Sequence, residues 1–406
     1  MHNSLLVYDY DLVIVGGGLA GASLALALTQ AFDKLKILVL EQKAPELAQY
    51  HQDFDQKTLA INQYTKEFFD KLKIWPADVA LNDILTPIKQ VHVSMQKAFG
   101  QFHFTPPKEY KALGYIIQAK YLESLILEKL LPIQNSGKLT WVQPIRELNL
   151  QAMPGGWKIG YIDGRENKKH QVSCQCIIGS DGPSSTIKKN LGISDRHSDY
   201  HHIATIANVD LTQHHENIAY ERFTQDGGAI ALLPYGSKRM TLIYTESTEK
   251  AKATQGLSDG DFLEKLTKNM GNRLGFTAIS KRTQVPLGMK IALHQIARRA
   301  ILMGNAAHFL HPIAAQGFNL SIQDIVGLIK TIHQDNHQKD LGSTAMLHDY
   351  LLAREFIQAQ YIGMTDKIAT HYASHQWPAW MKGLSLFCLD NIGVKNYFTE
   401  KSMGIA

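Results

Sequence analysis

The strongest constraint on the fold lies near the start of the chain, where an apolar strand runs directly into a glycine-rich turn. Residues 12–15 (Leu-Val-Ile-Val) are followed by Gly16-Gly17-Gly18-Leu19-Ala20-Gly21, which satisfies the pattern G-x-G-x-x-G. The pattern predicts a helix over residues 20–31 and a second strand over residues 36–40. A strand, a glycine turn, a helix and a strand in this order form the first βαβ unit of a parallel sheet.

The three glycines of this pattern have separate physical roles. Gly16 permits the tight turn, Gly18 lets a pyrophosphate approach the backbone, and Gly21 allows close contact between helix and strand. The N-terminus of the helix faces the phosphate charge. Glu41 ends the second strand, where a carboxylate can accept hydrogen bonds from the ribose hydroxyls. These residues predict a bound dinucleotide and do not distinguish FAD from NAD; a glycine turn without a ligand is the alternative.

A second segment of the same kind decides in favour of FAD. Gly304-Asn305-Ala306-Ala307-His308 follows an apolar strand at residues 300–303 and leads through residues 309–317 to a helix predicted from Phe318 to His333. The small residues let the backbone approach a flat ligand. The positive end of the helix favours the negative charge that a reduced isoalloxazine holds near N1 and O2. A third segment places Asp181-Gly182 after another apolar strand.

The rest of the chain predicts a mixed architecture. Helices are predicted over residues 56–75, over residues 120–131 with an end at Pro132, and over residues 259–270; the last 65 or so residues read as wholly helical. Residues 139–178 and 200–245 read as strands. We therefore expect an α/β, Rossmann-like FAD-binding domain of the glutathione-reductase type, with an inserted antiparallel β-sheet substrate domain and a helical C-terminus.

This organisation predicts domain segments that alternate along the chain. The FAD-binding domain is assigned residues 1–75, 111–195 and 286–340. The substrate domain is assigned residues 76–110 and 196–285, and the C-terminal helical region residues 341–406.

Composition excludes several other classes of protein. The net charge of +5 is small and the basic residues are dispersed, so no nucleic-acid partner is expected. Three cysteines, Cys174, Cys176 and Cys388, give no disulfide framework. His308 and His311 invite a metal interpretation, but no carboxylates accompany them, and we expect no metal. With neither a signal peptide nor a membrane span in the sequence, a cytoplasmic location is expected.

The three segments together resemble a known family. A glycine fingerprint, an Asp-Gly segment and a Gly-Asn-Ala-Ala-His segment, in this order, are the signatures of single-component flavoprotein aromatic monooxygenases. Within that group the chain is similar to the ubiquinone-biosynthesis hydroxylases of the UbiH, UbiF and VisC family, with the UbiH type (2-polyprenyl-6-methoxyphenol hydroxylases) as the nearest. The strings that carry this resemblance are Leu310-His311-Pro312-Ile313, Gln316-Gly317-Phe318-Asn319-Leu320, Ile206-Ala207-Asn208-Val209, Glu221-Arg222-Phe223-Thr224 and Ile362-Gly363-Met364-Thr365-Asp366.

The resemblance implies a role for each matching residue. Gly16, Gly18, Gly21 and Glu41 would hold the ADP half of FAD, and Asp181 with Gly182 would lie at the pyrophosphate and at the approach of the nicotinamide nucleotide. Asn305 would sit at the ribityl chain, where the family usually has Asp. The segment from Pro312 to Asn319 would line the isoalloxazine, with His311, Pro312, Gln316, Gly317 and Phe318 as the flavin-lining candidates. The remaining residues assigned to the cofactor are Lys57, Gln118, Gly304, Ala315, Gly317 and Asn319.

Three further positions depart from the family pattern. Lys57 stands where the family usually has arginine, Ala315 replaces a glycine of the flavin loop, and Ser321 replaces a glycine of the helix that follows. Lysine keeps the charge but loses the planar fork of a guanidinium. Alanine tightens the loop wherever the backbone needs a positive φ.

The implied function is the hydroxylation of the aromatic ring of a polyprenylated phenol in ubiquinone biosynthesis. NADPH or NADH would reduce FAD, O₂ would add to give a flavin C4a-hydroperoxide, and its distal oxygen would pass to the ring. No catalytic residue can be named from the sequence. The alternatives are a hydroxylase of another aromatic compound, a prenyl-lipid reductase, and a non-catalytic member of a ubiquinone-synthesis complex.

The apolar stretch from Trp377 to Phe387 leaves its partner open. It fits a helix packed on the core or on a sister subunit, and it also fits an interfacial surface that reaches a lipid-soluble substrate. The expected contacts are therefore a peripheral one at the inner face of the membrane, a homo-oligomer, or a ubiquinone-synthesis complex.

Overall fold

The predicted βαβ unit is present at the front of the chain. The computed structural model describes residues 7–44, 56–76, 84–98, 100–310, 317–334, 337–371 and 395–405. β1 (Tyr10–Val15), α1 (Leu19–Ala31) and β2 (Ile37–Leu40) follow one another as expected. β1 is the centre of a parallel array ordered β8-β2-β1-β11-β19, whose other members are β8 (Leu139–Val142), β11 (Lys168–Gly179) and β19 (Ala300–Leu302). Strands from three distant parts of the chain thus build one sheet.

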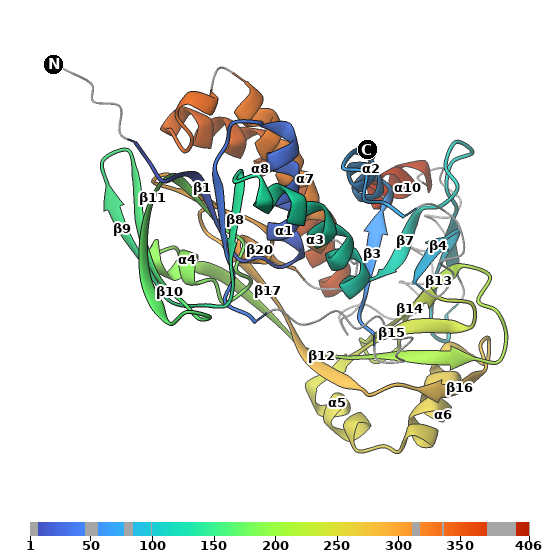
Figure 1. Cartoon of the computed structure of the whole chain (residues 1–406). Coiled ribbons are helices and arrows are strands. Elements are labelled where there is room, and N and C mark those ends of the chain that lie inside the picture. Colours follow the sequence, from blue (N-terminus) through green and yellow to red (C-terminus); the bar gives the residue numbers. More distant parts are fainter. Residues whose placement is uncertain are drawn as a thin grey trace.

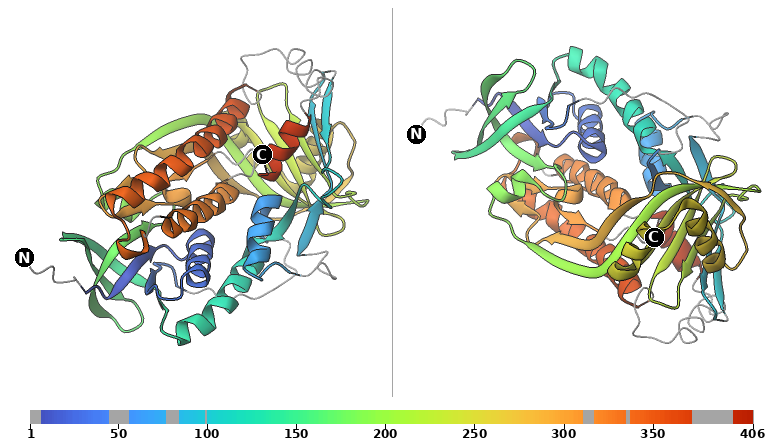
Figure 2. Two further views of the ribbon diagram at one scale, coloured as in Figure 1. Left: turned by 90° about the horizontal axis from the view of Figure 1, so that it is seen from above. Right: turned by 90° about the horizontal axis from the view of Figure 1, so that it is seen from below.

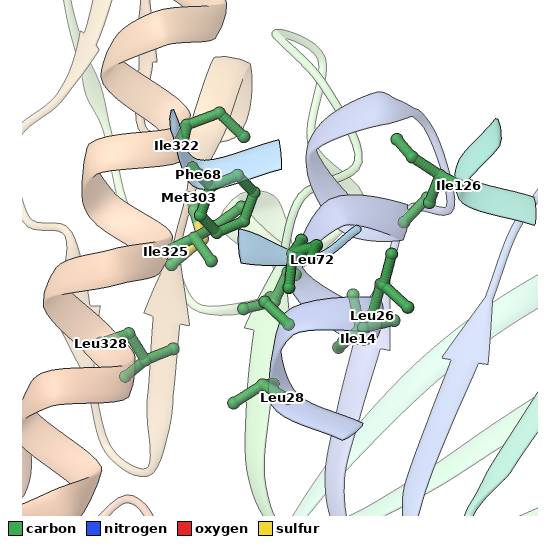
Figure 3. Close-up of a cluster of buried hydrophobic side chains, with 14 of the residues drawn as sticks. Ile14, Leu26, Leu28, Phe68, Leu72, Ile126, Met303, Ile322, Ile325 and Leu328 are labelled. Atoms are coloured by element: carbon green, nitrogen blue, oxygen red, sulfur yellow. The ribbon is translucent and has the colours of Figure 1, made fainter. Parts of the chain in front are cut away.

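The two faces of this sheet are buried against different partners. Leu12 and Ile14 of β1 face α1, α3 (Ala119–Asn135) and α7 (Gly317–His333), and Figure 3 shows the side chains of these elements meeting in one apolar core. Val13 and Val15 face the opposite side, where β10 (Gly156–Asp163) contributes Trp157 and Ile159. Alternate residues of β1 therefore serve two cores, which explains why the strand is apolar throughout. β9 (Ile145–Met153) extends the sheet through β10.

A second sheet of nine strands forms the other half of the molecule. Its path is β20-β17-β12-β15-β14-β13-β5-β6, and β16 pairs with β12. One face is covered by α5 (Thr248–Gln255) and α6 (Asp259–Met270), which lie below the sheet in Figure 1. The strands are β5 (Gln90–Met95), β6 (Gln101–Phe104), β12 (Asp195–Leu211), β13 (Ile218–Phe223), β14 (Ala229–Tyr235), β15 (Arg239–Ser247), β16 (Phe276–Ile279), β17 (Thr283–Ala292) and β20 (His308–Phe309).

A small third sheet lies on the opposite side of β14 and β15 (Figure 1). It has the order β3-β7-β4, formed by β3 (Thr58–Asn62), β4 (Leu85–Ile88) and β7 (Gly114–Gln118). Ile88 and Ile116 pack against Tyr235 of the nine-stranded sheet and against Met403 of α10 (Lys395–Met403). Figure 2 shows α7 and α8 (Thr344–His371) side by side on the edge of the molecule that also carries α1.

Two predicted helices are wrong in part. Residues 58–62 form β3, and the helix α2 (Gln63–Lys71) begins only after it, because Thr58 to Asn62 pair with β7 and the sheet overrides the local helical pattern. The helix predicted to end at Pro132 continues to Asn135. Pro132 is exposed near the helix end, where water can satisfy the carbonyl that its missing N–H leaves free.

The other long elements agree with the prediction. The helix predicted over residues 259–270 is α6, and the one predicted from Phe318 is α7, which begins one residue earlier. The predicted class is confirmed: an α/β domain with a parallel sheet, an antiparallel sheet-rich domain, and helices towards the C-terminus. β12 and β17 each cross a predicted domain boundary, since β12 begins at Asp195 and β17 ends at Ala292.

Candidate functional site

The three predicted motifs meet at one edge of the parallel sheet. Backbone hydrogen bonds join Gly16 N to Leu40 O (2.8 Å), Ser180 N to Val15 O (2.7 Å) and Met303 N to Gly179 O (2.9 Å). The carboxyl ends of β1, β2, β11 and β19 are thus held side by side, although they are far apart in the sequence. In open α/β sheets this edge is where ligands bind.

The glycine loop fits a pyrophosphate. A side chain at Gly21 would place its Cβ 1.8 Å from the carbonyl oxygen of Gly16, so only glycine allows α1 to approach β1 this closely. Gly16 has a φ of +104°, which favours glycine. A Cβ at Gly18 would meet nothing within 4 Å, which leaves room for a ligand against the backbone. No side chain caps α1 and its first turn has no acidic residue, so its positive end is available to a phosphate.

Glu41 lies directly beside this loop. Its Oε2 accepts a hydrogen bond from Gly17 N at 2.5 Å and its Oε1 accepts one from Lys43 N at 2.7 Å. An ionised carboxylate can accept further bonds, so its remaining lone pairs can serve ribose hydroxyls. Trp141, at the end of β8, stands so close that a Cβ at Gly17 would come within 2.5 Å of its ring. Trp141 could not be predicted as a site residue from the sequence, because an aromatic residue in a strand carries no motif.

The Asp181-Gly182 segment is a turn stabilised by its own aspartate. Asp181 Oδ2 accepts bonds from Thr186 N (2.6 Å) and Ile187 N (3.2 Å), at the start of α4 (Thr186–Asn190). Ser185 caps the same helix, since its side chain accepts a hydrogen bond from Lys188 N. Gly182 has a φ of +84°. The carboxylate therefore shapes the backbone next to Gly16.

The third motif touches both neighbouring helices. Gly304 begins the short 3₁₀ helix η1 (Gly304–Ala306) with a φ of +60°. A Cβ there would lie 3.3 Å from Cβ of Ala20 and 3.4 Å from Oγ of Ser321. Asn305 is exposed at this edge, as a ligand contact requires, and Gly317 begins α7 with open space beside it.

A buried polar network anchors this motif to α7 and α8. His308 Nε2 lies 2.6 Å from Oδ2 of Asp324, and Oδ1 of Asp324 accepts bonds from Arg354 Nε (2.7 Å) and Gln358 Nε2 (2.8 Å). Burial alone would raise the pKa of Asp324, but the neighbouring His308 and Arg354 hold that pKa below its ordinary value. His308 is therefore part of a buried polar network that joins the motif to α7 and α8.

Four predicted cofactor residues connect elements of the fold. Asn319 Oδ1 accepts a bond from Asn62 N (3.0 Å) and its Nδ2 donates to Ala60 O (3.0 Å), which joins α7 to β3. Gln118 Nε2 donates to the Tyr235 hydroxyl at 2.6 Å, which joins β7 to β14. Phe318 stacks on Phe69 in the apolar core, with ring centroids 6.3 Å apart. Lys57 is exposed immediately before β3, and its carbonyl accepts a bond from Ala119 N.

The remaining predicted residues lie outside the part of the chain that the structure describes. They are His311, Pro312, Ala315 and Gln316 of the flavin loop, together with the stretch from Trp377 to Phe387.

The nine-stranded sheet presents an open patch on the face that points away from α6. We call the open face the five neighbouring residues Ile206, Glu221, Ala231, Leu233 and Ile243. All five are partly exposed, whereas residues that alternate with them, such as Leu232 and Leu242, are fully buried against α6. An apolar surface of this kind in the middle of a sheet is a candidate floor for an apolar ligand.

Two contacts place the edge of the open face next to residues 56–58, which include the predicted cofactor residue Lys57. Thr241, which is paired with Leu233, has its Oγ1 2.8 Å from Oγ1 of Thr58. Asn208 donates from Nδ2 to Gln56 O at 2.9 Å. Residues 56–58, and Lys57 with them, therefore lie against the edge of the open face.

In the part of the chain that the structure describes, no three His, Cys, Asp or Glu side chains form a group that could hold a metal ion. None of the helices within it is both long and apolar enough to span a membrane.

The fold and the motif edge define a dinucleotide-binding α/β protein with an attached antiparallel sheet. Residues 9–362 match the family model described as an FAD binding domain. The chain belongs to this family, and the predicted FAD cofactor is confirmed with it.

Curated relatives and solved structures agree with this assignment. The chain is 26% identical over 401 residues to the ubiquinone hydroxylase UbiL of Rhodospirillum rubrum, with 97% of this chain and 89% of the relative covered. It is 23% identical over 394 residues to the 3-demethoxyubiquinol 3-hydroxylase of Escherichia coli, with 95% of each covered. PqsL of Pseudomonas aeruginosa, a probable FAD-dependent monooxygenase, has the same fold, with a TM-score of 0.72, 18% identity, and coverage of 93% of this chain and 99% of that one.

These similarities confirm the predicted resemblance to ubiquinone-biosynthesis hydroxylases and the predicted enzyme class, an FAD-dependent aromatic monooxygenase. The assignment to the UbiH type, the domain boundaries and the roles of individual cofactor residues stay predictions.

Proposed function

We propose that this protein hydroxylates the aromatic ring of a polyprenylated phenol in ubiquinone biosynthesis. The overall reaction takes one phenol, one O₂, one NADPH or NADH and one proton. It yields the hydroxylated phenol, the oxidised nucleotide and water. The observations that carry the proposal are the meeting of three motifs at one sheet edge and the open face of a second sheet, whose edge contacts residues 56–58.

The residues at the edge would divide the cofactor between them. The backbone of Gly16–Gly21 would hold the pyrophosphate at the positive end of α1, and Glu41 would accept the ribose hydroxyls. Asp181 and Gly182 would shape the turn beside it, and Asn305 would bond the ribityl chain. The bound flavin would supply the activation of O₂ and the transfer of one oxygen atom, which no side chain can supply.

The chain's own contribution is to position the phenol and to exclude water. The apolar residues of the open face, Ile206, Ala231, Leu233 and Ile243, would bind the ring and the first isoprene unit through burial of apolar area. Water exclusion favours transfer to the substrate over loss of the activated oxygen. This division explains why the site needs neither a metal nor a nucleophilic triad.

The proposal includes contact with a membrane surface, because a polyprenylphenol partitions into the bilayer. The stretch from Trp377 to Phe387 is the sequence segment suited to that contact. A second copy of the chain or another member of a ubiquinone-synthesis complex are its alternative partners. Co-sedimentation of the protein with anionic phospholipid vesicles, with and without a Trp380→Ala substitution, tests the membrane contact. Equal binding of both proteins to the vesicles counts against it.

One experiment tests the function. The purified protein is examined for its flavin spectrum and then supplied with short-chain prenylphenols, NADPH or NADH, and ¹⁸O₂. We expect bound FAD, phenol-stimulated nucleotide oxidation, and a product that carries one ¹⁸O atom. Product formed without O₂ would indicate a reductase. A colourless protein that FAD does not restore would indicate a non-catalytic member of a complex.

A further inference from the structure

One ionisable side chain, Glu221, lies on the open face. Its neighbours across the sheet are Ala231 of β14 and Val93 of β5. Along its own strand, Ala219 and Phe223 belong to two separate apolar clusters. The carboxylate therefore stands between apolar residues on the surface that the proposed function gives to the phenol.

The direction of this side chain follows from its neighbours on β13. Tyr220 packs with the apolar cluster of α6, and Arg222 donates from Nε to Asn269 O (2.7 Å) and from Nη1 to Ser94 Oγ (3.1 Å). Because successive side chains of a strand point to opposite faces, Glu221 points away from α6. It shares its face with Leu233, which is paired with Thr241, and Thr241 contacts Thr58 of the flavin-binding half.

No charge within the described residues compensates this carboxylate. Other ionisable side chains on this face of the nine-stranded sheet lie four residues along their strands from the row that contains Glu221. Four residues of a strand correspond to a distance of about 13 Å. These side chains are His202, Asp210, Tyr235 and Arg239. His202 contacts the carbonyl of Gly227, Arg239 donates to Asp210, and Tyr235 accepts a bond from Gln118. β5 and β6 present only apolar side chains there, namely Val91, Val93, Met95, Phe102 and Phe104. The flavin-binding half adds Lys57, which is exposed.

Burial therefore acts on Glu221 without an opposing charge, and it raises the pKa of this carboxyl to about 7. A carboxylate with a pKa in this range is suited to accept and release a proton near neutral pH. Since a well-folded protein has no structural need for an unpaired carboxylate among apolar residues, its presence at this point calls for a chemical role.

We propose that Glu221 is the catalytic base of the hydroxylation and accepts the proton of the substrate's phenol hydroxyl. The inference rests on the proposed function. The O–H bond of the phenol breaks, the proton goes to a carboxylate oxygen of Glu221, and the electron pair stays on the phenolate. The phenolate is electron-rich at its ring carbons, one of which receives the oxygen atom derived from O₂. The ring C–H proton is released as aromaticity returns, and Glu221 loses its proton to water before the next turnover.

The test compares Glu221→Gln with a matched control, Glu264→Gln. Glu264 is exposed on α6, beyond the other face of the same sheet, so its substitution repeats the chemical change away from the site. We expect Glu221→Gln to lower kcat/KM for a short prenylphenol by roughly 10²–10⁴-fold, while the control stays within about twofold of the native protein. FAD content and the rate of flavin reduction by NADPH without phenol should be unchanged in both.

A second measurement separates proton transfer from a structural role. With ring-fluorinated prenylphenols, which ionise at lower pH, the loss caused by Glu221→Gln should shrink as the phenol becomes more acidic. Glu221→Asp should recover part of the activity. In the native protein kcat/KM should rise with pH through about 7, because the carboxyl must be ionised to accept a proton, and this limb should vanish in Glu221→Gln.

The outcomes are distinguishable. A native protein that forms no hydroxylated product from any phenol overturns the proposed function, and the inference with it. A native protein that hydroxylates the phenol, beside a Glu221→Gln variant within about threefold of it, overturns the inference alone. An equal loss for all phenols, whatever their acidity, also overturns it, since a purely structural defect would act on all substrates alike.

Discussion

The motif edge of the parallel sheet and the open face of the antiparallel sheet prepare a site in different ways. At the edge, the backbone shapes the site. Gly16, Gly18 and Gly21 contribute because they have no side chain, and the polar groups come from loops that follow strands. On the open face, side chains shape the site, and the five residues come from four strands. A single stretch of sequence encodes the first arrangement, whereas only the folded sheet assembles the second.

The difference bears on what each region tolerates. A backbone site depends on a few positions at which any side chain collides with the fold. A side-chain site on a sheet face leaves the fold intact when a residue changes, because the opposite face holds the core. We therefore expect a side chain at a crowded glycine of the edge to affect cofactor binding and stability together, and substitutions on the open face to affect catalysis with only small changes in stability.

The largest effect is expected for Gly21→Val, compared with Gly18→Ala. A side chain at Gly21 collides with the carbonyl of Gly16, so the variant should bind FAD at least about 1,000-fold more weakly, a change of about 4.1 kcal/mol, and melt at a lower temperature as apoprotein. Gly18→Ala meets open space and should weaken FAD binding without lowering the melting temperature of the apoprotein. Calorimetric titration with FAD and melting of both apoproteins measure this. Native-like FAD binding by Gly21→Val would contradict the backbone explanation.

A nearly equal effect, on stability alone, is expected for Asp324→Asn. The substitution leaves the buried guanidinium of Arg354 without its counter-charge, and breaking a buried pair in this way costs about 3–5 kcal/mol. Asp349→Asn is the matched control, because its contact with His337 at 2.9 Å is partly exposed and is worth no more than about 1 kcal/mol. Denaturant unfolding of the apoproteins gives both values. Equal destabilisation by the two substitutions would show that the network around His308 has no special weight.

Leu242 and Ile243 are adjacent residues of β15 that point to opposite faces of the antiparallel sheet, so substituting each of them tests one face. Leu242→Ala empties a fully buried position against α6 and should lower the free energy of unfolding by about 2–5 kcal/mol. Ile243→Ala removes a partly exposed residue of the open face and should cost less than about 1 kcal/mol, while it raises KM for the phenol by roughly tenfold. Unfolding curves and steady-state kinetics measure the pair. An unchanged KM in Ile243→Ala would remove the open face from the substrate site.

The smallest effect is a gain in stability for Glu221→Gln. The pKa of Glu221 is raised from 4.5 to about 7 in the folded protein, so the native protein binds this proton more tightly when folded and loses stability as pH rises from about 4.5 to 7. The neutral amide avoids this loss. The variant should melt about 2–4 °C higher than the native protein above pH 7 and at the same temperature near pH 4.5. A variant that melts lower at pH 8 would mean that the carboxylate is paired in the folded protein.

The sequence predicts the motif edge well and the open face hardly at all. The loop at Gly16–Gly21, the helix that follows it and Glu41 were predictable because their chemistry depends on residues close together in the chain. Glu221 belongs to one of the strings that carry the family resemblance. The sequence does not show to which face of the sheet its side chain points, because the alternation of residues in β13 does not say which side meets α6. The Gln118–Tyr235 and Asn319–Asn62 bonds were equally hidden, because they join residues far apart in sequence. The strand β3 was mistaken for helix for the same reason: its partner β7 lies about fifty residues away.

The long pair of strands β12 and β17 has a mechanical consequence. They are hydrogen-bonded from Asp195 and Ala292, near the parallel sheet, to Ile206 and Thr283, beside α5 and α6, so one continuous ribbon spans both halves of the molecule. A paired ribbon resists stretching and shear within its plane far more than it resists bending. We therefore expect a relative movement of the two halves to bend this ribbon at its bulge between Asp199 and His202 rather than to slide one half past the other. A disulfide or a bulky side chain that stiffens the bulge should therefore restrict the relative movement of the two halves.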